Sequence, residues 1–280
     1  MTGGSADIQV QALTGAIGAE ISGVDLAREL PDESIARIRQ ALLDHLVIFF
    51  RGQEITPTQQ LAFVSRFGEP DIYPFVKGVE DFPEITPVLK REDETVNFGG
   101  IWHSDTVYQD KPPMGTVLYA KELPPMGGDT LFANQYQAYE DLSAPLRSFL
   151  DGLTAINSAT KGSAAATRSD RVADGGTGAK EILEAKHPVV RTHPETGRKA
   201  LYVNTGHTVR FDGMTEAEST PILEYLYHHQ IKPEYCCRFV WSPGAIAFWD
   251  NRCAQHYPVN DYHGHRRLLH RITLKGDRPF

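Results

Sequence analysis

The chain has 280 residues, of which 41% are apolar and 23% are charged, so it is long enough to bury a large core without disulfide or metal support. Its net charge of −8 and the absence of any run rich in Lys and Arg argue against a broad nucleic-acid-binding surface. The longest apolar runs, such as residues 46–50, are far too short to span a bilayer.

The cysteines and the start of the sequence indicate a compartment. Cys236 and Cys237 are adjacent in a strand-like run, so they would point to opposite faces, which is poor disulfide geometry. With Cys253 the count is odd, which is typical of reduced thiols inside a cell. The first residues show no charged segment followed by an apolar stretch, so no signal peptide is expected. We therefore expect a cytoplasmic protein with no membrane or nucleic-acid partner.

Two helices are predicted near the start. The first begins at Asp32 as N-cap, carries apolar residues at helical spacing and runs into an apolar strand at residues 46–50. The second begins after Thr56 as N-cap, with Gln59 completing a capping box, and it stops at Gly68.

Two further helices and many short strands follow. One helix covers residues 134–150 and is capped again near Ser143, and the other opens at Thr215 with Glu218 three residues on. Strands are expected at residues 115–123, 129–133, 187–193, 199–204, 235–241, 245–250 and 268–276. This pattern favours a mostly β chain with peripheral helices, an antiparallel sandwich or jelly roll in a single domain spanning residues 1–280. The small, polar, glycine-rich residues 159–181 are expected to form a mobile lid or a disordered segment.

A histidine and an aspartate two residues apart indicate a first candidate site. If residues 99–110 are extended, His103 and Asp105 point to the same face of a strand. An aspartate that orients a core histidine is the ordinary interpretation of such a pair, and a metal site needs another ligand. His256 follows an apolar strand and a polar turn, which presents it at a strand mouth. Two histidines and one carboxylate are the ligands of non-heme Fe(II) oxygenases, although a zinc hydrolase can use the same set.

Two arginines beyond His256 help to choose between these chemistries. Arg267 and Arg271 lie four residues apart in a β-rich run and share a face. Aimed into a metal cavity, they would bind two anions or one dianion through bidentate contacts. An oxygenase that uses 2-oxoglutarate needs such an anchor, whereas a simple zinc hydrolase does not. The alternative is a surface cluster in which these arginines pair with Asp261 or Asp277.

Three motifs together resemble a known family. They are WHSD at residues 102–105, GGDT at 127–130, and WDNRCAQHYPVNDY with RRLLHRITLKGD across 249–277. They are similar to the motifs of the taurine dioxygenase family of Fe(II)/2-oxoglutarate-dependent enzymes, and the similarity covers nearly the whole chain in the family's order. The resemblance implies a double-stranded β-helix and an oxidoreductase that needs Fe(II), 2-oxoglutarate and O2. Its implied reaction hydroxylates a small anionic organic substrate and releases succinate and CO2. A homo-oligomer, either a dimer or a tetramer, also fits the family.

The resemblance also implies roles for individual residues. His103, Asp105 and His256 match the iron ligands and so the catalytic centre. Arg267 matches the arginine that pairs with the distal carboxylate of 2-oxoglutarate, and Thr130 matches the hydroxyl partner of that carboxylate.

The substrate positions depart from those of the taurine enzyme. Arg271 keeps the match to an arginine that holds the anionic head of the substrate. Tyr73 stands where the taurine enzyme has a substrate-binding histidine, and Gly99 stands where it has an asparagine. His207 and Ala159 fall on positions of the aromatic wall. We therefore expect Tyr73 and His207 to contact an aryloxyalkanoate, alkyl sulfate or sulfonate other than taurine. Taurine dioxygenase proper, a zinc-dependent hydrolase and a non-catalytic jelly roll that binds a small acid remain as alternatives.

Overall fold

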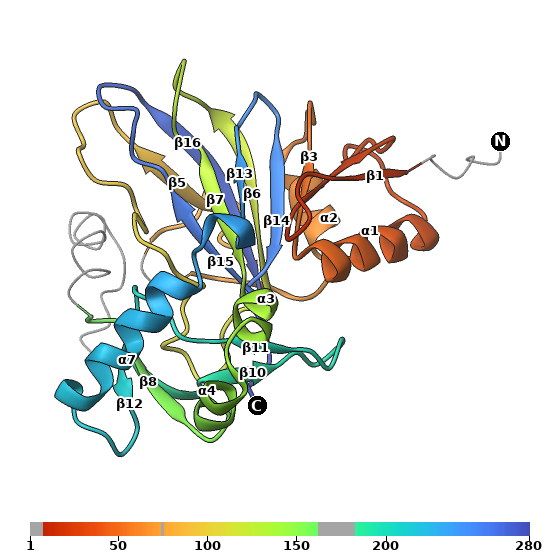
Figure 1. Cartoon of the computed structure of the whole chain (residues 1–280). Coiled ribbons are helices and arrows are strands. Elements are labelled where there is room, and N and C mark those ends of the chain that lie inside the picture. Colours follow the sequence, from red (N-terminus) through yellow and green to blue (C-terminus); the bar gives the residue numbers. More distant parts are fainter. Residues whose placement is uncertain (1–7, 74–75, 162–182) are drawn as a thin grey trace.

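The computed structural model describes residues 8–73, 76–161 and 183–280 (Figure 1). Its helices are α1 (Asp32–His45), α2 (Pro57–Val64), α3 (Gln135–Glu140), α4 (Ala144–Leu150) and α7 (Glu216–His229), with a 3-10 turn at Pro233–Tyr235. Its strands are β1 (Gln9–Ala12), β2 (Ala19–Ser22), β3 (Val47–Phe50), β4 (Pro70–Asp71), β5 (Thr86–Lys90), β6 (Gly115–Glu122), β7 (Thr130–Asn134), β8 (Thr154–Ser158), β9 (Glu184–Pro188), β10 (Val190–Thr192), β11 (Lys199–Leu201), β12 (Thr208–Phe211), β13 (Cys236–Phe239), β14 (Ile246–Asp250), β15 (Ala254–Pro258) and β16 (Arg267–Leu274).

Two facing sheets enclose the site. The large sheet has the order β1-β2-β3-β14-β6-β16-β4, with β5 beside β16, and the facing sheet has the order β13-β7-β15. Figure 1 shows the facing sheet running along the large one in the upper part of the molecule. Phe132 and Phe239 from the smaller sheet pack with Trp249 and Leu269 from the larger one in a single buried cluster. This arrangement is the predicted jelly roll, a mostly β fold with peripheral helices.

The central strands β3 and β14 of the large sheet are apolar on both faces. In β3, Val47 and Phe49 join the cluster between the sheets, whereas Ile48 and Phe50 join a second cluster with residues of α1 and α2. Alternate side chains of a strand point to opposite faces, so a continuous apolar run is what a strand covered on both sides requires. The two N-terminal helices therefore close the outer face of the sheet, beside β3 and β14 in Figure 1.

A third apolar cluster holds the lower part of the molecule in Figure 1. It contains residues of α3, α4 and α7 together with residues of β8, β10, β11 and β12. Among the described residues, no helix combines the length and the apolar character that a membrane crossing requires.

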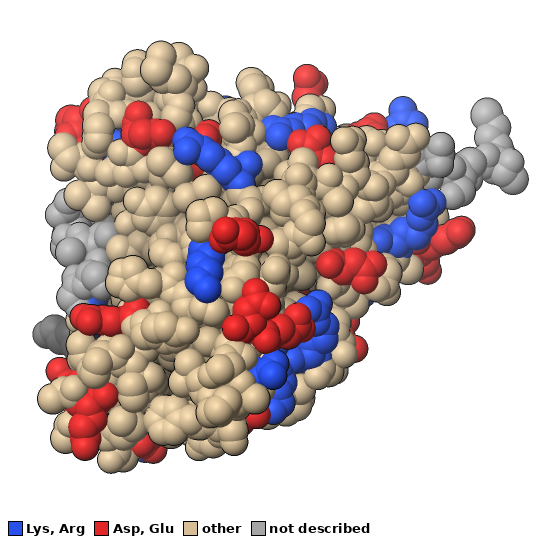
Figure 2. Space-filling view, in the orientation of Figure 1, with Lys and Arg blue, Asp and Glu red and all other residues tan. Residues whose placement is uncertain are grey.

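Figure 2 shows that Lys and Arg side chains on the face in view lie next to Asp and Glu side chains. Ion pairs such as Arg51–Glu20, at 2.7 Å, are formed by such neighbours.

Two predicted helix starts are confirmed and one is wrong. Thr56 and Thr215 each accept a hydrogen bond from the backbone N–H three residues on, and both capping boxes are complete. Asp32 is not the N-cap of α1, because the cap position falls on Pro31 and the Asp32 carboxylate pairs with Arg66 instead. The second helix also ends at Val64, before Gly68, because the next backbone hydrogen bonds join residues three apart instead of four, such as Arg66 N–H to Phe63 O.

The predicted strands are mostly present with shifted ends. The expected strand at residues 187–193 is divided into β9 and β10 at Val189. The predicted helix at residues 134–150 is likewise two helices, and Ser143 stands at the cap of the second, as expected. Most of the proposed lid at residues 159–181 lies outside the described residues.

Candidate active site

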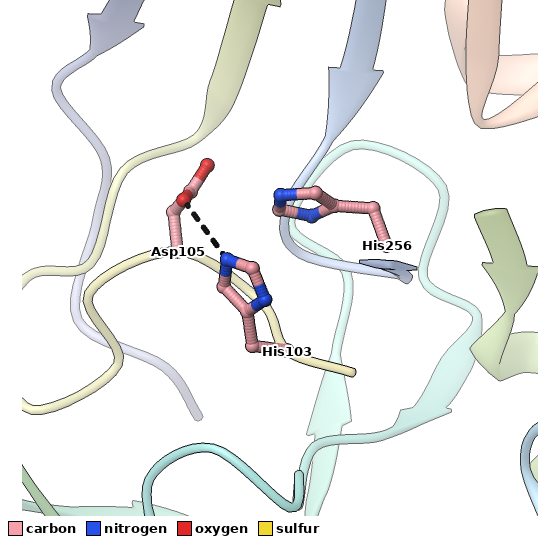
Figure 3. A group of neighbouring side chains, drawn as sticks. All are labelled: His103, Asp105 and His256. Atoms are coloured by element: carbon pink, nitrogen blue, oxygen red, sulfur yellow. Dashed lines mark ion pairs between the residues drawn. The ribbon is translucent and has the colours of Figure 1, made fainter. Parts of the chain in front are cut away.

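Two histidines and one aspartate meet inside the mouth of the jelly roll (Figure 3). The possible ligand atoms of His103, Asp105 and His256 all lie within 4.8 Å of one another, and the three residues are buried. Nε2 of His103 lies 3.7 Å from Oδ1 of Asp105, and the two imidazole centroids are 4.2 Å apart. The structure therefore brings together the three residues that the sequence named as candidate metal ligands.

The backbone that carries this triad differs from our expectation. Residues 99–110 are not a strand, so the prediction that His103 and Asp105 share a strand face is wrong. His103 forms an isolated bridge with His256, through N–H···O hydrogen bonds of 3.1 and 2.9 Å, and Asp105 lies in the turn that follows. Positive φ angles of 69° at Gly99 and 42° at Thr106 turn the chain on either side of the bridge. Backbone pairing of the two histidines, together with this turn, assembles the triad.

The two oxygens of the Asp105 carboxylate have different neighbours. Thr116 donates a hydrogen bond of 2.6 Å to Oδ2, and Asn251 donates a longer one of 3.4 Å to the same atom. Oδ1 faces Nε2 of His103 and Nη1 of Arg271, each at 3.7 Å. Burial by itself would raise the pKa of Asp105, but the positive charge of Arg271 and the hydrogen bond from Thr116 help to outweigh it, and that pKa lies well below its usual range. The carboxylate is therefore ionised.

Both histidines can present an imidazole nitrogen to a metal. His103 donates from Nδ1 to the carbonyl oxygen of Ile101 at 2.7 Å, so Nε2 is the nitrogen that can offer a lone pair. Burial lowers the pKa of His256 to about 3, so this ring is uncharged near neutral pH. Two imidazole nitrogens and one carboxylate oxygen form a donor set that fits a divalent transition metal.

A first prediction concerns Thr116. The variant Thr116→Val loses the hydroxyl that orients the Asp105 carboxylate, and we expect its affinity for Fe(II) or Co(II) to fall about 10- to 100-fold. Equilibrium titration of the metal-free protein measures this affinity. Ser219→Ala is the matched control, because it also loses a buried hydroxyl contact, to the Phe211 N–H, in another part of the fold. Equal affinities for Thr116→Val and wild type would contradict the assigned role.

The two candidate anion-binding arginines are buried beside the triad. Arg267 and Arg271 are 4% and 6% exposed, and both line a pocket with His103 and His256. The alternative of a surface cluster with Asp261 or Asp277 is therefore wrong. Asp277 pairs with Arg191 at 3.0 Å, and Asp261 accepts a hydrogen bond from the Gly128 N–H.

Unsatisfied donors show what this pocket can hold. Nε and Nη2 of both arginines are buried and have no hydrogen-bond partner among the described residues. Burial lowers the pKa of Arg267, the sign of a desolvated guanidinium. Nη1 of Arg271 lies 3.7 Å from Oδ1 of Asp105, but the buried Nε and Nη2 donors of both arginines still lack an acceptor. Buried donors without an acceptor are unfavourable, so the pocket fits an anion that accepts from these groups. Thr130 lines the same pocket.

A second pocket opens on the other side of Arg271. Tyr73, Phe98, Tyr108 and His207 line it together with Arg271. The Arg271 guanidinium carbon lies 4.3 Å from the centroid of the Tyr73 ring, and the His207 and Tyr108 rings are 5.1 Å apart. Both predicted substrate residues, Tyr73 and His207, therefore lie in this mostly aromatic pocket.

Gly99 stands where the family has an asparagine, and Asn97 lies two residues before it. A Cβ atom on Gly99 would lie 3.0 Å from Cε1 of His103, and its φ of 69° is one that side chains rarely adopt, so a larger residue here would be crowded and strained. Asn97 instead accepts a hydrogen bond of 2.8 Å from the Tyr262 hydroxyl and donates to the backbone of residues 258–259. It supports the wall of the arginine pocket.

Sequence reasoning missed several residues of the site. Thr116 reaches Asp105 from β6, and Asn251 reaches it from the turn after the neighbouring β14. Asn251 is the polar residue inside the WDNR motif that could have been suspected. Lys90 faces Arg267 across the β5–β16 pair and lies 4.1 Å above the Tyr262 ring. No local pattern marks Lys90, because it ends an ordinary apolar strand.

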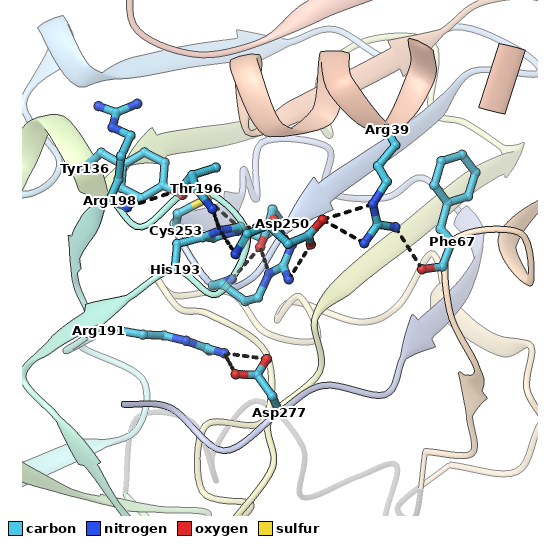
Figure 4. Close-up of polar contacts among 12 residues, drawn as sticks. Arg39, Phe67, Tyr136, Arg191, His193, Thr196, Arg198, Asp250, Cys253 and Asp277 are labelled. Atoms are coloured by element: carbon cyan, nitrogen blue, oxygen red, sulfur yellow. Dashed lines mark hydrogen bonds and ion pairs between the residues drawn. The ribbon is translucent and has the colours of Figure 1, made fainter. Parts of the chain in front are cut away.

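A second buried polar cluster lies at the end of β14 (Figure 4). It contains His193, Asp250 and Cys253, whose side chains also fall within 4.8 Å of one another. Arg252 occupies both Asp250 oxygens, and His193 uses Nε2 for Asp250 and Nδ1 for two backbone N–H groups. Burial raises the pKa of Cys253, so its thiol stays protonated. With its charges and ring nitrogens committed, this cluster fixes the turn after β14 and has no open position for a metal.

A second prediction tests this cluster. Asp250→Asn leaves Arg252 buried without its full counter-charge, so we expect the free energy of unfolding to fall by about 3–5 kcal/mol. Burial raises the pKa of Asp250, but Arg252 and His193 outweigh it and hold the pKa below its usual range. The difference from wild type should thus be full near neutral pH and shrink as the pH falls below about 4.

Urea unfolding of wild type and Asp250→Asn, carried out near neutral pH and again below about pH 4, measures this difference in the free energy of unfolding. The control is Asp212→Asn, which removes an exposed ion pair with Lys186 and should leave the stability close to that of wild type. If Asp250→Asn is as stable as Asp212→Asn at neutral pH, the cluster does not stabilise the fold as described.

Comparisons with known proteins agree with this geometry. The profile of the family described as "Taurine catabolism dioxygenase TauD, TfdA family" matches residues 9–273. The chain is 36% identical to an alkylsulfatase of Acinetobacter baylyi, over 96% of this chain and 86% of that protein. It is 34% identical to an alpha-ketoglutarate-dependent sulfate ester dioxygenase of Pseudomonas putida, over 98% and 91% of the two chains. A crystal structure described as a taurine dioxygenase from Burkholderia xenovorans superposes with a TM-score of 0.83 at 39% identity, covering 97% of this chain and 92% of that one.

Proposed function

The chain belongs to the TauD, TfdA family of 2-oxoglutarate-dependent dioxygenases, and from that membership we propose that it oxidises a small organic anion, most favourably a sulfate ester, at the His103–Asp105–His256 centre. Enzymes of this family use Fe(II), 2-oxoglutarate (alpha-ketoglutarate) and O2, so the protein is an oxidoreductase. The observation that carries the proposal is the set of unpartnered Arg267 and Arg271 donors in the pocket that also contains the triad histidines.

We assign the two ends of the cavity as follows. His103, Asp105 and His256 would hold Fe(II), which when bound supplies O2 activation coupled to oxidative decarboxylation of 2-oxoglutarate to succinate and CO2. Arg267 and Thr130 would hold the distal carboxylate of 2-oxoglutarate, because both line the first pocket away from the aromatic one. A dicarboxylate in this pocket would satisfy buried donors that are otherwise unpaired.

The chain's own contribution is positioning and exclusion of water. Thr116 and Asn251 fix the Asp105 carboxylate, and Ile101 fixes the His103 tautomer. The aromatic side chains around Arg271 keep water from its guanidinium, which strengthens its attraction for an anion. Substrate and co-substrate would therefore meet at the triad in a fixed orientation. Such positioning is the main way in which a protein controls the chemistry of its cofactor.

The second pocket favours an anion without an ammonium group. Among the described residues that line it, the one carboxylate is Asp105, which is committed to the triad. The ammonium of taurine would therefore lack a counter-charge there, whereas an alkyl sulfate offers an anion for Arg271 and an apolar chain for Tyr73 and Phe98. The two sulfate-ester relatives support the same choice, and aryloxyalkanoates share its chemistry.

A substrate panel tests this proposal. Purified protein with Fe(II), 2-oxoglutarate and O2 is supplied with a medium-chain alkyl sulfate, an aryloxyalkanoate or taurine, and succinate and sulfate are measured. We expect the alkyl sulfate to give succinate and free sulfate in equal amounts, with a kcat/KM for taurine lower by about 100-fold or more. A preference for taurine would contradict the substrate assignment and restore taurine dioxygenase proper.

A further inference from the structure

Trp241 touches both groups that are assigned to the distal carboxylate. Its indole Nε1–H donates a hydrogen bond of 3.0 Å to Oγ1 of Thr130. Its ring lies 5.6 Å from the guanidinium carbon of Arg267. The side chain is buried, 8% exposed, and follows β13, in which Phe239 pairs directly with Thr130. One residue outside the sequence motifs therefore connects the hydroxyl and the guanidinium.

The direction of this hydrogen bond decides what Thr130 can do. A threonine hydroxyl has one proton to donate and two lone pairs to accept with, whereas an indole N–H can only donate. Trp241 therefore occupies a lone pair of Oγ1 and leaves the hydroxyl proton uncommitted. Among the described residues, no other hydrogen bond of Oγ1 competes for that proton, and Thr130 lines the arginine pocket.

We propose that Trp241 is a positioning residue for the co-substrate: it fixes Thr130 as a donor and supports Arg267, so that the pocket selects 2-oxo acids with a distal carboxylate. This inference rests on the proposed co-substrate site. Without the indole N–H, the Thr130 hydroxyl is free to rotate, and its hydrogen bond to a carboxylate is no longer prepared before binding.

A ligand pair separates positioning from simple packing. 2-Oxoglutarate and 2-oxopentanoate share the groups at the metal end and differ only in the distal carboxylate. Binding of each to the anaerobic Fe(II) protein is followed by the visible charge-transfer band, without turnover. The variant Trp241→Phe keeps an aromatic ring beside Arg267 and Phe239 but removes the N–H donor. We expect its Kd for 2-oxoglutarate to rise about tenfold, with the Kd for 2-oxopentanoate unchanged.

A double-mutant cycle identifies the partner. In the Thr130→Val background there is no hydroxyl to orient, so adding Trp241→Phe should change the Kd for 2-oxoglutarate by less than about twofold. Tyr136→Phe is the matched control. It removes one hydrogen bond from a buried aromatic residue of the same apolar cluster, to Thr196, and should leave both Kd values unchanged.

The outcomes separate this inference from the proposal on which it rests. If wild-type protein shown to contain iron does not bind 2-oxoglutarate, the proposed function fails. If the wild type binds but Trp241→Phe weakens both acids equally, or is fully additive with Thr130→Val, Trp241 only packs and the inference is overturned. Selective weakening of 2-oxoglutarate together with loss of additivity supports it.

Discussion

Replacing His256 by alanine is expected to abolish turnover and to remove stoichiometric iron from the protein. The ring supplies one of three donors that lie within 4.8 Å of one another, and its burial keeps it neutral at the pH of assay. Without the His256 ring, the centre would keep Asp105 and the single imidazole of His103, which are too few protein donors to retain Fe(II). We expect kcat to fall by at least about 1,000-fold, measured as succinate formed, with bound iron quantified in parallel.

A matched control is a second buried histidine outside the triad. His229→Ala removes such a histidine, whose Nε2 contacts the Ala138 carbonyl oxygen. We expect that variant to keep its iron and its turnover, even if it is less stable. A His256→Ala protein that retained one equivalent of iron and measurable turnover would show that the triad is not the metal centre.

The second large effect is expected at Arg267. The variant Arg267→Leu removes a buried guanidinium with unpartnered Nε and Nη2 donors, so the distal carboxylate of 2-oxoglutarate would lose its charged partner. Leaving that carboxylate buried and unpaired costs about 3–5 kcal/mol, so the KM for 2-oxoglutarate should rise by about 100- to 5,000-fold. Initial rates at increasing 2-oxoglutarate concentration measure this change.

Two further variants sharpen the Arg267 test. Arg267→Lys keeps the charge but loses the bidentate geometry, so its KM should fall between those of wild type and Arg267→Leu. Arg198→Leu, which removes an exposed pair with Glu140, should leave the KM unchanged. If Arg267→Leu showed a wild-type KM, the distal carboxylate would have to bind elsewhere in the cavity.

The architecture was predictable because its signals are local. The capping boxes at Thr56 and Thr215 are carried by residues three apart, and both helices begin where those boxes place them. The apolar strands of the large sheet are buried on both faces, and such runs stand out in the sequence. Pairing between distant strands, such as β3 with β14, has no comparable local signature.

The candidate site likewise contains some residues that the sequence marks and others that only the folded chain reveals. His103, Asp105 and His256 were found from residue type and motif, although the reason first given for the His103–Asp105 pair, a shared strand face, was wrong. Thr116 and Trp241 were missed because their partners lie 11 and 111 residues away and meet them only in the folded chain. A threonine or tryptophan inside an apolar strand region looks like core until its hydrogen-bond partner is known.

The most direct measurement is an anaerobic titration of the Fe(II) protein with 2-oxoglutarate, followed by visible absorption. We expect a metal-to-ligand charge-transfer band that saturates at one equivalent, is absent from the Zn(II) protein, and shifts when an alkyl sulfate is added. Protein shown to contain one equivalent of iron that develops no band at any 2-oxoglutarate concentration would contradict the assignment of the triad and the two arginines. Hydrolysis of an ester by the Zn(II) protein without O2 would then favour the hydrolase alternative.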